Sequence, residues 1–106
     1  MRLLSNDKPY TAPESSYELE ALELLPCGTT QDDRSFVLVR YESLKPEVIE
    51  GDHFFLSAKE AIENAEQFYR IKKTSWYLES DQHFKNNLEE NIEIILEHHF
   101  NNLKQK

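Results

Sequence analysis

Short apolar runs in the first half of the chain predict β-strands. Residues 35–42 give the clearest signal, because β-branched and aromatic residues follow one another there and Pro46 closes the segment. Apolar residues occupy both alternating positions of this run, which indicates a central strand covered on both faces for part of its length. Residues 53–56 predict a second, shorter strand that leads directly into a helix.

Residues 17–25 are compatible with a strand or with a helix. Tyr17, Leu19 and Ala21 alternate with glutamates, as on a half-buried strand. A helix is the alternative, because a capping-box pattern precedes the segment and Pro26 follows it. A helical projection scatters the leucines around the cylinder and leaves no single apolar face, so we favour the strand.

The second half of the chain shows helical periodicity. Residues 57–60 form a capping box, and the residues that follow place apolar side chains at intervals of one helical turn. The expected inner face of this helix comprises Ala58, Ile62, Ala65 and Tyr69, with Ala61 and Phe68 beside them. Residues 76–78 either extend the helix or form a short strand.

A second helix is expected from Asp81, as its cap, to about Leu103. Its apolar stripe comprises Phe84, Leu88, Ile92, Ile95, Leu96, His99 and Leu103, with Phe100 beside it. Glu89, Glu93 and Glu97 form an acidic stripe next to it, with one helical turn between successive glutamates. Ile94 projects away from the apolar stripe, so we expect its side chain to be exposed.

Together these elements predict an α+β fold, a small antiparallel sheet of about three strands packed by two C-terminal α-helices. The length of the chain fits a single domain over residues 1–106. Within it we expect an extended N-terminal arm at residues 1–16, in which a short strand is left open, a β-rich part at residues 17–56 and a two-helix part at residues 57–106.

The balance of charges narrows the functional classes. The chain has 20 acidic and 12 basic residues and a net charge of −8, so it lacks the excess of cations with which proteins bind nucleic acids or anionic membranes. Its two glycines are too few for a phosphate-binding glycine loop, and no apolar run is long enough to span a membrane. A single cysteine excludes an internal disulfide, and we expect a cytoplasmic protein of bacterial or phage type.

Catalytic and metal-binding patterns are weak in this sequence. Cys27 is a candidate nucleophile in a loop, and His53, the one histidine outside the C-terminal helix, is the base that it would need. The adjacent His98 and His99 point about 100° apart on a helix, so they do not readily share one metal ion. We therefore expect no metal, no cofactor and no enzymatic activity.

The acidic surface is then the main functional feature. We expect a non-enzymatic protein-binding module, such as a small inhibitor, an immunity-type protein or a regulatory subunit, whose partner presents a basic surface. The residues expected to contact the partner are Glu89, Glu93, Ile94, Glu97, Asp32 and Asp33.

Two other functions stay open. One is a nucleic-acid mimic that blocks a nucleic-acid-binding protein with its acidic helix. The other is a small thiol-dependent enzyme that uses Cys27 and His53. Either a monomer or a homodimer through the C-terminal helix fits the sequence, because Ile94 and Phe100 flank the apolar stripe of that helix.

Overall fold

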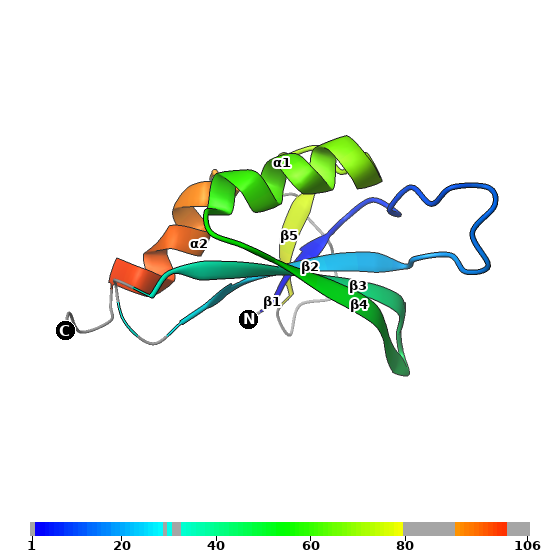
Figure 1. The fold of residues 1–106 in the computed structure, drawn as a ribbon, viewed down its shortest axis with the longest axis horizontal. Coiled ribbons are helices and arrows are strands. Elements are labelled where there is room, and N and C mark those ends of the chain that lie inside the picture. The colour runs from blue at the N-terminus through cyan, green and yellow to red at the C-terminus, as the bar shows by residue number, and fades with distance from the viewer. Residues whose placement is uncertain (1, 29, 31–32, 80–90, 102–106) are drawn as a thin grey trace.

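One antiparallel sheet carries both helices on the same face (Figure 1). The computed structural model describes residues 2–28, 30, 33–79 and 91–101. In chain order the elements are β1 (Arg2–Ser5), β2 (Ala21–Cys27), β3 (Ser35–Leu44), β4 (Glu47–Phe55), α1 (Ala58–Tyr69), β5 (Trp76–Glu79) and α2 (Ile92–Asn101). The strands lie in the order β4-β3-β2-β1-β5. The α+β class is therefore confirmed, and the expected number of strands is corrected from about three to five.

The N-terminal arm contributes a strand to the interior of the sheet. β1 lies between β2 and β5 and pairs with both of them, Leu3 opposite Leu24 on one side and Leu78 on the other. The arm expected over residues 1–16 was an extended segment in which a short strand was left open, and β1 is such a strand. Four residues that begin with an arginine are too short to show strand alternation, so the pairing depends on neighbours that are distant in sequence.

The ambiguous segment before Pro26 is a strand, as favoured, and it starts at Ala21. Pro26 lies inside β2, opposite Phe36 of β3. Proline is tolerated there because the described pairing of β1 with β2 stops at Leu24, so the missing N–H at Pro26 faces no strand on that side.

β4 is longer than the strand expected at residues 53–56. It begins at Glu47 and pairs with β3 along its whole length. The register shifts between Arg40 and Tyr41, where Gly51 pairs with Arg40 and Ile49 with Tyr41, so Glu50 is an extra residue in a β-bulge. This bulge interrupts the alternation of apolar and polar residues, and it explains why sequence periodicity revealed only the last part of the strand.

α1 begins as its sequence predicts, and it ends at Tyr69. The Ser57 hydroxyl accepts a hydrogen bond from the Glu60 N–H (3.1 Å), and Arg70 ends the helix in the left-handed conformation at φ 58°. The buried residues are Ala58, Ala61, Ile62 and Ala65. Phe68, which was expected beside the inner face, is instead exposed.

α2 is shorter than the helix expected from Asp81 to Leu103. Asn91 caps it, because the Asn91 side-chain oxygen accepts a hydrogen bond from the Glu93 N–H (2.8 Å), so one continuous helix through residue 91 is wrong. The predicted positions Asp81, Phe84, Leu88 and Leu103 lie outside the described residues. The inner face comprises Ile92, Leu96 and Phe100. His99, expected in the apolar stripe, is exposed.

The main core fills the space between the sheet and the two helices. Trp76 of β5, left open between helix and strand by its sequence, is completely buried there. Phe36 and Phe100 meet edge to face, with ring centroids 5.4 Å apart, and so join β3 to α2. Val37 and Tyr41 are buried on the other face of β3, which confirms the expected two-sided cover of this strand.

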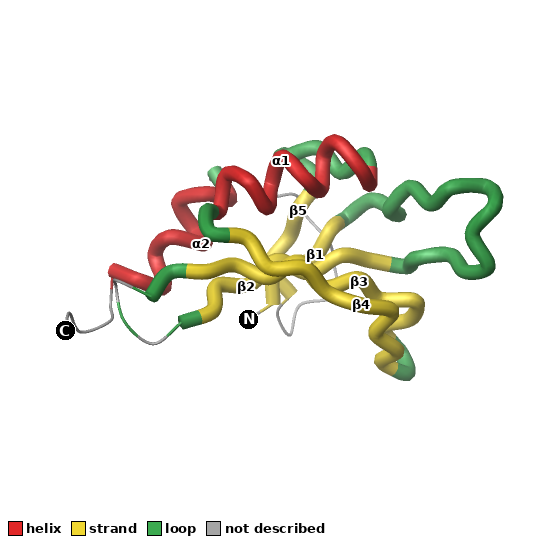
Figure 2. Tube along the Cα trace, in the orientation of Figure 1, coloured by secondary structure: helices red, strands yellow, loops and turns green. Residues whose placement is uncertain are grey.

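The loop between β1 and β2 extends past the C-terminal end of α1 (Figure 2). It is fixed there, because the Tyr10 N–H donates to the Tyr69 carbonyl oxygen (2.9 Å) and the Arg70 guanidinium lies 3.9 Å from the centre of the Tyr10 ring.

Neither helix in the described part of the chain has the length and apolarity needed to cross a membrane.

Candidate binding surface

The described residues among those expected to contact a partner fall at one end of the sheet. Glu93, Ile94 and Glu97 lie on α2, and Asp33 lies in the nearby connection between β2 and β3. The Arg34 guanidinium binds the Glu97 carboxylate at 2.7 Å and ties that connection to the helix. Asp32 and Glu89 lie outside the described residues.

The acidic stripe on α2 is not a row of free carboxylates where the structure describes it. Glu97 is engaged by Arg34, and Glu93 lines a pocket together with Lys59 and Lys73 and with the acids Glu63 and Glu66. The guanidinium of Arg34 beside Glu97 distinguishes this part of the stripe from a row of phosphates. Ile94 is exposed, as expected.

Cys27 and His53 are far apart. Cys27 pairs with Ser35 of β3, whereas His53 pairs with Leu38 on the opposite side of that strand. Two strand spacings and three residues along the strand separate them, a distance on the order of 14 Å. A thiol–imidazole pair needs direct hydrogen-bond contact. The two residues therefore do not form such a pair in this fold.

Among the described residues, no group of three or more His, Cys, Asp or Glu side chains is placed to hold a metal ion.

A different surface gathers exposed apolar side chains at the β4 edge of the sheet. β4 pairs with β3 alone among the described strands, so its outer edge has no strand beside it. Three large apolar side chains of β4, together with Leu56 directly after it, are between 40% and 82% exposed, whereas Phe55 packs against the core. This surface, which we call the β4 rim, comprises Val48, Ile49, Phe54 and Leu56.

A pocket of about 330 Å³ adjoins β4 on the side of the helices. We call it the aromatic pocket; its lining includes Tyr10, Tyr17, Arg40, His53, Phe68 and Tyr69. His53 and Phe68, both exposed, bring it to the outer edge of β4 and the surface of α1. Sequence reasoning missed this pocket because the loop after β1, two strands and α1 each contribute part of it. The exposed Phe68 was its one signal in the sequence, and it resembled a core position.

The lining of the aromatic pocket includes Arg40, whose charge is paired with the carboxylate of Glu50. Burial is the largest single effect and lowers the pKa of Arg40, but the hydrogen bonds and charges of Glu50 and Tyr69 together outweigh it and the pKa is raised. Gly51 makes room for the guanidinium, since a Cβ atom there would lie 2.2 Å from a terminal nitrogen of Arg40. The charge of Glu50 also raises the pKa of Tyr17. The pocket therefore presents aromatic surface and paired charges rather than a free cation.

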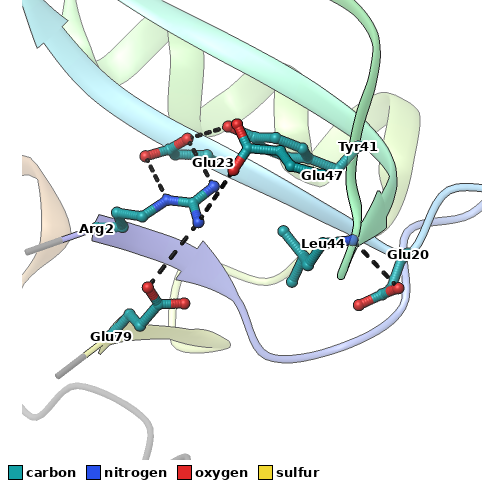
Figure 3. A network of polar contacts seen from close by, with 7 residues as sticks. All are labelled: Arg2, Glu20, Glu23, Tyr41, Leu44, Glu47 and Glu79. Carbon is teal, nitrogen blue, oxygen red and sulfur yellow. Dashed lines mark hydrogen bonds and ion pairs between the residues drawn. The ribbon is translucent and has the colours of Figure 1, made fainter. Parts of the chain in front are cut away.

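On the opposite face of the sheet, Arg2 is surrounded by carboxylates from three strands (Figure 3). Its guanidinium lies 3.3 Å from Glu23, 3.7 Å from Glu47 and 3.9 Å from Glu79. The Tyr41 hydroxyl donates to the same Glu23 carboxylate at 2.5 Å. This network links every strand of the sheet and has a structural explanation, so we do not treat it as a binding site.

Models of protein families, curated proteins and solved structures were compared with this chain, and none of them matches it.

Proposed function

We propose that the chain is a non-enzymatic module that binds another protein through the β4 rim and the aromatic pocket. The partner presents a basic surface. The observation that carries this proposal is the clustering of exposed Val48, Ile49, Phe54 and Leu56 along one edge of the sheet. Several large apolar side chains exposed along one element are typical of interaction sites.

The charge of the rim supports a basic partner. β4 carries Glu47, Glu50 and Asp52 and has no lysine or arginine. Glu50 is paired with Arg40 and Glu47 lies near Arg2, whereas Asp52 is exposed. Together with the net charge of −8, these acids attract a cationic partner and repel an acidic one, and they contribute mainly to the rate of encounter.

The proposal is tested by comparing what wild type and two double variants capture from a cell extract. Phe54→Ser with Leu56→Ser removes two rim side chains, and Ile94→Ser with Glu97→Gln changes the surface of α2 that the sequence favoured. Proteins captured at low and at high salt are identified by quantitative mass spectrometry.

We expect wild type and the α2 variant to retain the same basic proteins, and the rim variant to lose them. Higher salt lowers the yield, because surface electrostatics are screened. Equal capture by all three chains would refute a role for the rim. If only the α2 variant fails to capture the basic proteins, the binding site lies on α2, at Glu93, Ile94 and Glu97.

A further inference from the structure

We propose that the partner docks by adding an extended segment as an extra strand at the outer edge of β4, with one of its apolar side chains in the aromatic pocket. This inference rests on the proposed function and specifies how the partner is recognised. An exposed sheet edge offers unpaired backbone N–H and C=O groups, and an added strand satisfies them while its alternate side chains confer specificity.

The edge of β4 is only partly protected against such pairing. Proteins protect edge strands with prolines, charged side chains, β-bulges, short strands or a covering segment. β4 spans Glu47–Phe55, contains neither proline nor lysine, and pairs on one side only among the described strands. The bulge at Glu50 divides it, and residues 51–55 pair with β3 in uninterrupted register. We therefore place the added strand against residues 51–55.

Both faces of this edge offer contacts for alternate side chains. On the helix side, His53 borders the aromatic pocket and lies 4.9 Å, ring to ring, from Phe55. Phe68 of α1 lines the same pocket. On the other side, Phe54 is exposed opposite Val37, and Ile49 is exposed opposite Tyr41. A strand laid beside β4 would direct one apolar side chain toward His53 and Phe68, and its neighbours toward Phe54.

Charge distinguishes a basic segment from a second copy of this chain. Like charges that face each other across a strand pair are destabilising, and opposite charges contribute favourably. A second β4 would bring Asp52 close to its own copy or to Glu50, with no lysine or arginine on either strand to compensate. A segment that places lysine or arginine beside Asp52 forms an opposite-charge pair there, which stabilises the added strand. We therefore assign the edge to an extended cationic segment of a partner protein.

The test uses a displayed library of short random peptides, selected against the full chain. We expect the selected peptides to carry net positive charge and to alternate apolar and basic residues. Nuclear magnetic resonance then compares amide hydrogen exchange in the free and bound chain, and the expected result is new protection within residues 51–55. A matched peptide, methylated on alternate backbone nitrogens, keeps its charges and side chains but cannot complete the ladder, and we expect it to bind at least tenfold more weakly.

The outcomes separate the mode of docking from the proposed function. If the methylated peptide binds as tightly as the unmethylated one, or if amide protection appears outside residues 51–55, strand addition is overturned. The proposal of a basic partner is unaffected by that result. Selection of acidic peptides, or of none, would overturn the cationic segment. Protection of residues 51–55 by the chain alone at high concentration, with a doubled mass in sedimentation, would assign the edge to a second copy. Loss of peptide binding in Phe54→Ser, with retention in Ile94→Ser, is the expected control result.

Discussion

At the scale of single residues, Arg2 and Tyr41 share the Glu23 carboxylate on the face of the sheet opposite the helices. Glu23 is buried, so its charge depends on these two partners for compensation. The hydrogen bond with Glu23 raises the pKa of Arg2 and keeps the guanidinium charged. Removal of one partner would leave a buried carboxylate poorly compensated, and this makes the network sensitive to the protonation of Tyr41.

Tyr41 predicts a loss of stability in alkaline solution. Burial and the hydrogen bond to Glu23 raise its pKa from 10.0 to about 12. Because the folded pKa lies above the unfolded one, this stabilisation is complete below pH 10 and is lost as pH rises through 12. Over this range we expect the unfolding free energy of the wild type to fall by about 2–3 kcal/mol more than that of Tyr41→Phe. Urea denaturation at several pH values measures it, and parallel pH profiles would contradict the assignment.

At the scale of elements, the sequence predicted the helices and the central strand better than the sheet edges. The Ser57 cap and the β-branched run of β3 are local signals, and both appear where expected. β1 and β5 are four residues each, and they are strands because they pair with each other. Most of β4 was not predicted, because the bulge at Glu50 interrupts the alternation of apolar and polar residues along the strand.

The candidate site was less accessible to sequence reasoning than the fold. Exposed Ile94 was recognised because a helical projection separates it from the apolar stripe. Phe54 and Phe68 were not, because a hydrophobic residue in a strand or helix is usually placed in the core until the topology shows which edge is open. Only the strand order reveals that β4 is an edge.

Two neighbouring isoleucines test the orientation of α2. Ile92 is 2% exposed and Ile94 is 64% exposed. Ile92→Ala removes buried apolar volume and should lower the unfolding free energy by about 2–4 kcal/mol. Ile94→Ala makes the same chemical change at the surface and should alter it by less than about 0.5 kcal/mol. Denaturant unfolding of both variants provides the measurement, and similar losses would show that the helix does not present the described face to the sheet.

At the scale of the whole molecule, charge and exposed apolar surface act in opposite directions on self-association. A homodimer through the C-terminal helix was considered because Ile94 and Phe100 flank its stripe. Phe100 is completely buried against Phe36, so it is not available to a second copy. The β4 rim is another exposed apolar surface, and the acids of β4 repel one another when the β4 strands of two copies meet.

Asp52 therefore predicts a variant that self-associates more strongly than wild type. In an antiparallel pairing of two β4 strands centred near Gly51 or Asp52, each Asp52 lies opposite or diagonal to another acid, which costs roughly 0.2–1 kcal/mol per pair. Asp52→Asn removes that repulsion and leaves the apolar rim intact, so we expect severalfold tighter self-association in a sedimentation series at increasing concentration. Glu66→Gln, on the exposed face of α1, makes the same change in net charge away from the edge and should behave as wild type. Equal association of the two variants would show that net charge alone, and not the acid on β4, keeps the copies apart.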